Sequence, residues 1–94
     1  MSVDKYSAGK QKAIQYAKML ENKLKEYNAK KEEVQFFIDI EFSKNDKSCL
    51  IGMDFMEGDI VYVYFMDNPD LGGYANPSEE EINKLAETAR SVIG

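Results

Sequence analysis

The sequence predicts a single α+β domain in the order α-β-β-β-α. Segments near both ends of the chain show the three-and-four spacing of amphipathic helices, whereas the middle alternates apolar and polar residues as half-buried strands do. A chain of 94 residues supports one hydrophobic core. We therefore expect residues 1–94 to form one domain, in which residues 1–6 are a disordered N-terminus.

The first helix is predicted over residues 7–28. Its apolar side chains recur at steps of three and four, and lysines cover the opposite side. This stripe consists of Ala13, Ile14, Ala17, Leu20, Leu24 and Tyr27. Its alanines would allow the helix to approach a sheet closely.

Two strands follow, the first of them beginning at Val34, where the period of the apolar residues changes to two. The turn formers of residues 44–47 separate this strand from the second. A register that puts the apolar residues of both strands on one side is strongly favoured, and we take that side as the core. It pairs Phe42 with Cys49, Ile40 with Ile51, Ile38 with Met53 and Phe36 with Phe55.

The third strand is predicted over residues 60–66, which are all apolar or amphipathic, so both faces of the strand prefer cover. Its orientation depends on the turn at residues 57–59, because a shift of one residue reverses every side chain. A three-residue loop with Gly58 left-handed would bury Val61, Val63 and Phe65 and turn Ile60, Tyr62, Tyr64 and Met66 outward. A two-residue turn would do the reverse. The first alternative is favoured because tyrosine suits a half-wet surface.

Residues 67–76 are rich in proline, glycine, asparagine and aspartate, which predicts a long connection without a regular element. The last helix comes next. Either Asn76 caps it, with Pro77 in its first turn, or Ser78 and Glu81 form a capping box. Its buried stripe is predicted to be Ile82, Leu85, Ala86, Ala89, Val92 and Ile93.

The three strands are expected to form an antiparallel meander with both helices side by side on one face, in two layers. The alternative places the helices on opposite faces. In the first arrangement the other face stays open and shows an apolar patch with an acidic rim, as interaction surfaces do. The predicted partner-binding residues are Phe37, Leu50, Met56, Tyr62, Tyr64 and Met66, with Leu71 and Tyr74 from the long connection. The predicted rim is Asp39, Glu41 and Asp54.

The net charge of −5 is unevenly distributed. Residues 1–31 hold eight lysines and three acids, a balance of +5, whereas residues 32–94 hold four basic residues and fourteen acids, a balance of −10. One interpretation is a solvated basic helix beside an acidic sheet, and another is an acidic surface for a basic partner. Neither a helix-turn-helix spacing nor a ladder of aromatic and basic residues occurs, so nucleic acid is not favoured as a partner.

The chain has no histidine, which excludes catalytic triads, imidazole bases and histidine metal sites. Cys49 stands alone in an apolar segment and is interpreted as a small buried residue in a reducing, cytoplasmic compartment. No segment approaches the ~18 apolar residues of a membrane span. We predict no cofactor and no metal. Asp39 and Asp54 on one sheet face are the remaining candidates for carboxylate catalysis.

These observations favour a small acidic, non-enzymatic protein-interaction module that binds a protein partner through its open sheet face, as a homodimer. In size, charge and element order the chain is similar to secretion chaperones and to immunity proteins that neutralise a basic toxin, so a chaperone-, adaptor- or immunity-like role is expected. The alternatives are small-molecule or cation binding at residues 67–76 and a carboxylate-based enzyme.

Overall fold

The computed structural model of the chain describes residues 7–94, so the prediction for residues 1–6 lies outside the described residues. The fold is α+β, as predicted, with two helices and an antiparallel sheet. The sheet has five strands where the sequence predicted three. The elements are α1 (Ser7–Lys23), β1 (Asn28–Val34), β2 (Phe37–Lys44), β3 (Lys47–Asp54), β4 (Tyr62–Phe65), the short 3-10 helix η1 (Pro69–Leu71), β5 (Gly73–Ala75) and α2 (Glu79–Ile93).

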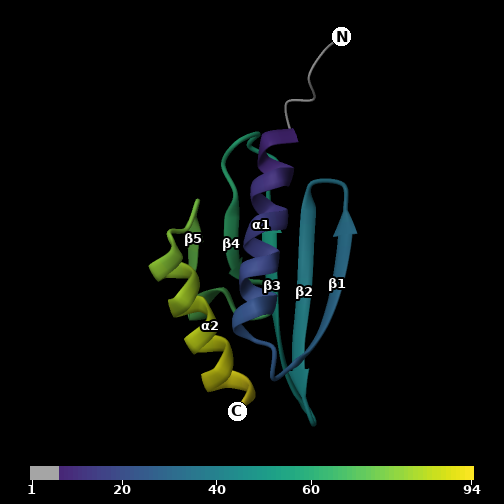
Figure 1. Ribbon diagram of the computed structural model, residues 1–94, viewed down its shortest axis with the longest axis vertical. Coiled ribbons are helices and arrows are strands. Elements are labelled where there is room, and N and C mark those ends of the chain that lie inside the picture. The colour runs from purple at the N-terminus through teal and green to yellow at the C-terminus, as the bar shows by residue number, and fades with distance from the viewer. Residues whose placement is uncertain (1–6) are drawn as a thin grey trace.

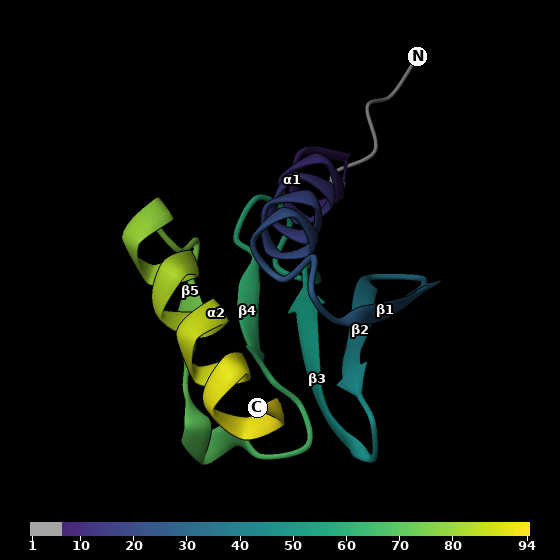
Figure 2. The same ribbon diagram turned by 60° about the horizontal axis from the view of Figure 1, so that its bottom comes forward.

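Both helices lie on one face of the sheet and run in the same direction, which confirms the two-layer arrangement and excludes helices on opposite faces (Figures 1 and 2). The strands follow one another across the sheet in chain order, β1 to β5. The core is the layer of buried side chains between the helices and strands β2–β4. Val92 was predicted in the buried stripe, but it is 36% exposed, so this part of the prediction is wrong.

Strand β1 was not predicted, and it shortens the two elements that were predicted on either side of it. The helix α1 ends at Lys23, and Leu24 and Tyr27 reach the core from the connection that follows it. The alternating run that begins at Val34 is interrupted by a turn in which Gln35 has a φ of 47°, so Val34 pairs with Phe37 and is 51% exposed. Two-residue hairpin turns favour glycine or asparagine, and glutamine provides no such signal.

The predicted register of the central strands is confirmed. Ile38 pairs with Met53, and Ile40 and Phe42 pair with Ile51 and Cys49 in the same ladder. The pairing continues past the ends of the strands, because the Phe55 N–H donates to the Phe36 carbonyl over 3.0 Å.

The orientation of β4 is the one that the three-residue loop predicts. Asp54 pairs with Tyr62, and Val61, Val63 and Phe65 are fully buried. Gly58 has a φ of 88°, a conformation that glycine adopts without strain.

The connection over residues 67–76 is more regular than predicted, because it contains η1 and β5. Strand β5 has three residues, of which the first is Gly73, so it offers no apolar alternation to recognise. Asn76 does not cap α2; its side-chain Oδ1 accepts a hydrogen bond from the Val61 N–H over 2.9 Å. The cap is the alternative capping box, in which the Ser78 N–H donates to Glu81 Oε1 over 2.9 Å and the Glu81 N–H donates to Ser78 Oγ over 3.2 Å.

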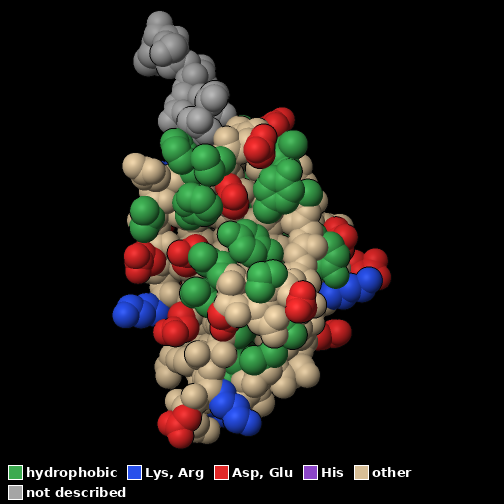
Figure 3. All heavy atoms as spheres, turned by 180° about the vertical axis from the view of Figure 1, so that it is seen from behind, with side chains coloured by type: hydrophobic (Ala, Val, Ile, Leu, Met, Phe, Trp, Pro, Cys, Tyr) green, Lys and Arg blue, Asp and Glu red, His purple; other side chains and the backbone are tan. Residues whose placement is uncertain are grey.

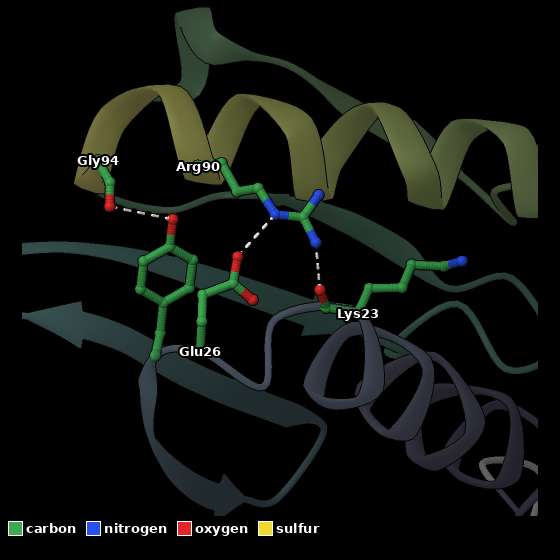
Figure 4. A network of polar contacts seen from close by, with 5 residues as sticks. Lys23, Glu26, Arg90 and Gly94 are labelled. Atoms are coloured by element: carbon green, nitrogen blue, oxygen red, sulfur yellow. Dashed lines mark hydrogen bonds and ion pairs between the residues drawn. The ribbon is translucent and has the colours of Figure 1, made fainter.

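A polar cluster joins the C-terminal ends of the two helices (Figure 4). The Arg90 guanidinium donates to Glu26 Oε2 over 2.8 Å and to the carbonyl of Lys23, the last residue of α1. The Tyr27 hydroxyl donates to the Gly94 carbonyl over 3.4 Å. A carbonyl at a helix end lacks an intrahelical partner, so Arg90 satisfies α1 while it ties α2 to the chain leading into β1.

Candidate functional site

Neither of the two described helices covers the second face of the sheet (Figure 2). Figure 3 views this side and shows apolar side chains gathered on it, with acidic side chains around and between them. Directly opposite residues of an antiparallel ladder share one face, so the strand register defines which side chains project there. We call the following set the open face: Phe37, Asp39, Glu41, Leu50, Gly52, Asp54, Tyr62, Tyr64 and Met66.

Most of the predicted partner-binding residues lie on this face. Phe37, Leu50, Tyr64 and Met66 are half-buried, and Tyr62 is 39% exposed. Four of them come from the neighbouring strands β2, β3 and β4, and Met66 directly follows β4. The Met66 N–H donates to the Leu50 carbonyl over 2.9 Å, so this residue continues the pairing with β3. These apolar side chains therefore project from adjacent strands and are partly exposed.

The other three predicted residues are not in the set that the strand register defines. Met56 is beyond the end of β3, in the turn before β4, and is 51% exposed. Leu71 and Tyr74 pack against the hydrophobic core, and Tyr74 pairs with the buried Val63. The structure therefore places Tyr74 on the side that the helices cover and does not bring it to the open face.

Gly52 lies at the centre of the open face, paired with Asp39 on one side and Tyr64 on the other. A Cβ atom on Gly52 would lie 2.6 Å from both Cγ and Sδ of Met66. The absence of a side chain thus lets the methionine lie across β3. An isolated glycine inside a strand is a signal of such close approach, and the sequence reasoning did not use it.

Asp39 has an unusual environment for a residue of the rim. Its Oδ1 atom is buried and has no hydrogen-bond partner among the described residues. Desolvation raises the pKa of the Asp39 carboxyl, and the nearby Glu32 raises it further. The pKa of Tyr64 is raised too, first by burial and then by Asp54 and Asp39. The face therefore combines apolar contact area with a negative field.

A shallow hollow of about 220 Å³ lies beside Asp39, between the outer surfaces of β1, β2 and β3. Its lining includes two residues that the sequence analysis did not select, Lys30 and Glu32 of β1. They were missed because β1 has no apolar alternation. The complete lining is Lys30, Glu32, Asp39, Glu41 and Leu50.

The described residues form no group of three or more histidine, cysteine, aspartate or glutamate side chains that could hold a metal ion.

Two further side chains are candidates for chemistry, Asp54 and Cys49. The Asp54 carboxylate has one hydrogen-bond partner, because its Oδ1 accepts a hydrogen bond from the Met56 N–H over 2.9 Å. Cys49 is buried, and desolvation, with Asp67, raises its pKa to about 11. A thiol with this pKa is protonated at neutral pH and is a poor nucleophile.

Within residues 7–94, neither helix has the length and apolar character to cross a membrane. No protein-family model, curated protein sequence or solved structure matches the chain. The surface itself must therefore support any assignment of function.

Proposed function

We propose that the protein is a non-enzymatic interaction module, which binds a basic protein partner through the open face. The observation that supports this most directly is the position of the unpartnered Asp39 carboxylate among half-buried apolar side chains. A carboxylate with one buried oxygen that accepts no hydrogen bond is unfavourable in the free protein. A partner that provides both apolar contact and a cation relieves that cost on binding.

The chemistry of the face favours arginine or lysine on the partner. A guanidinium or ammonium group that enters the hollow beside Asp39 would form charge-assisted hydrogen bonds and also meet Glu32 and Glu41. Lys30 lines the same hollow, so its flexible side chain would turn toward solvent when the cation enters. Tyrosine and methionine supply contact area around this point and adapt to irregular surfaces. The balance of −10 over residues 32–94 would steer a basic protein toward the face.

The open face is a poor surface for a homodimer. Two copies that met face to face around a two-fold axis would bring like acidic rims together, which opposes association. We therefore assign the face to a basic partner. A chaperone-, adaptor- or immunity-like role in the cytoplasm is compatible with this assignment, since each needs a binding surface and no catalytic group.

No observation favours the alternatives at residues 67–76. This segment forms η1 and β5, and its apolar residues Leu71 and Tyr74 pack against the core. We therefore do not propose a ligand site there.

The proposal is tested with a probe peptide in which arginine alternates with leucine, titrated into the ¹⁵N-labelled full chain and followed by NMR. We expect shifts concentrated on β2, β3 and β4, and weaker binding when glutamate replaces arginine in the peptide. Tyr62→Glu should weaken binding about tenfold or more, because it removes an aromatic anchor.

Val92→Glu is the matched control, since Val92 is 36% exposed and Tyr62 39% exposed, and Val92 lies on α2. This variant should bind the peptide as the wild type does. Equal weakening by both variants, or equal affinity for the acidic peptide, would contradict the proposal.

A further inference from the structure

Strand β1 is a long free edge of the sheet. All seven of its residues are exposed, and within residues 7–94 its one neighbour in the sheet is β2. Figure 1 shows it on the far side of β2 from the helices. Such an edge presents unpaired backbone N–H and C=O groups, which can pair with another strand.

The hairpin turn determines which backbone groups are free. Val34 and Phe37 close a two-residue turn, so they form a hydrogen-bonded pair, and pairs of this kind alternate along the ladder. The backbone groups of Lys30 and Glu32 therefore point toward β2. Those of Ala29, Lys31 and Glu33 point away from the sheet and are available to a further strand.

The charges of β1 are complementary to those of a second copy of β1 that runs antiparallel to it. Its sequence contains Lys30, Lys31, Glu32 and Glu33 in succession. Because side chains alternate between faces, each face carries a lysine followed two residues later by a glutamate. An antiparallel copy presents the same pair in the opposite order, so lysine lies opposite glutamate.

One register satisfies both the backbone and the charges. With Lys31 at the two-fold axis, Ala29, Lys31 and Glu33 face the free backbone groups of the second copy. Lys30 of each copy then lies opposite Glu32 of the other copy. The two-fold axis thus creates two such pairs, both on the side of the open face. The two Lys31 residues meet at the axis, where Glu21 of α1 already pairs with Lys31 over 3.6 Å and compensates the charge.

We propose that two copies of this chain associate through β1, in antiparallel register centred on Lys31, and form one continuous sheet. The two open faces then lie on the same side of the joined sheet and remain accessible. The homodimer expected from the sequence is thus assigned to a sheet edge. Lys30 and Glu32 also line the hollow beside Asp39, so the two proposals share these residues. Dimerisation is measured on the chain alone, and its failure would leave the residues of the open face unaffected.

The test is the molar mass of the full chain by light scattering across a wide range of concentration at low salt. We expect a concentration-dependent dimer. Lys30→Glu and Glu32→Lys each replace two opposite-charge pairs by two like-charge pairs, and each should weaken the dimer roughly tenfold. The double variant Lys30→Glu/Glu32→Lys exchanges the charges and should restore dimerisation. A monomeric wild type, or single variants that dimerise like the wild type, would overturn the proposal.

Proline substitution provides a second, independent measurement. Lys31→Pro removes an N–H group that points away from the sheet, so we expect a folded monomer by circular dichroism and light scattering. Lys30→Pro, the matched control, removes an N–H group bonded to β2 and should lower the stability of the fold. If Lys31→Pro remained dimeric while Tyr64→Glu became monomeric, the dimer would belong to the open face instead.

Discussion

Met66 lies directly over Gly52, so close that a methyl group on the glycine would meet both Cγ and Sδ of the methionine at 2.6 Å. The two residues come from different segments, one in β3 and the other just after β4. This contact sets the shape of the open face at its centre, next to Asp39.

Gly52→Ala should therefore reshape the surface with little effect on folding. The methionine is flexible and can move, and alanine in a strand recovers about 0.5–1 kcal/mol of backbone entropy, so we expect stability to change by less than ~1 kcal/mol. Affinity for the arginine-leucine peptide should fall roughly threefold to tenfold. Calorimetric titration and urea unfolding measure the two effects.

Met66→Ala provides the control for this variant. If displacement of the methionine causes the loss of affinity, Gly52→Ala should have no further effect in the Met66→Ala background. Additive losses in the double variant would mean that Gly52 acts on the face in another way.

Asp39→Asn should raise the stability of the free protein near neutral pH and lower its affinity for the basic peptide. Because burial raises the pKa of Asp39 in the folded state, the folded chain binds more protons than the unfolded chain between the two pKa values. The contribution of Asp39 to stability therefore becomes less favourable as pH rises through that window. The advantage of asparagine should shrink on acidification.

Thermal unfolding at several pH values measures this difference, with Glu41→Gln as control because Glu41 is an exposed carboxylate on the same strand and face. An Asp39→Asn advantage that did not change with pH would show that the amide stabilises the fold through some other contact.

The strands that the sequence predicts well are those with strong apolar alternation. In β2 and β3 a shift by one residue would expose every apolar side chain, so the register followed from the pattern alone. The prediction of the orientation of β4 had a different basis, because it rested on the amphipathic character of Tyr62 and Tyr64 and not on an alternating pattern. The two edge strands were missed, because β1 has four successive charged residues at its centre and β5 has three residues beginning with glycine. The burial of Asp39 Oδ1 depends on neighbours in three dimensions and has no local signal.

Gly9→Ala should destabilise the fold, although alanine has the higher helix propensity. Gly9 is buried in α1 against the turn before β4, and an added Cβ would lie 1.9 Å from the Gly58 carbonyl oxygen and 3.0 Å from Phe55 Cβ. A backbone oxygen cannot rotate away as a side chain can. The helix must move instead, which overrides the ~1 kcal/mol gain in propensity and should cost a net of about 1–3 kcal/mol.

Urea unfolding measures this loss, and Gln15→Ala, at an exposed position of the same helix, should stay within about 0.5 kcal/mol of the wild type. A Gly9→Ala chain as stable as the wild type would show that α1 does not need close contact with the turn.

Val63 and Tyr64 are neighbours on β4 and should respond in opposite ways to an acidic substitution. Val63 is fully buried and pairs with Met53 in the core, so Val63→Asp places an unpaired carboxylate among apolar side chains. This costs several kcal/mol, comparable to the whole stability of a small domain, and we expect an unfolded chain. Tyr64 is half-buried on the open face, and Tyr64→Glu should fold because water can reach the new carboxylate. Circular dichroism with a thermal melt distinguishes the two results; an unfolded Tyr64→Glu together with a folded Val63→Asp would mean that β4 faces the other way.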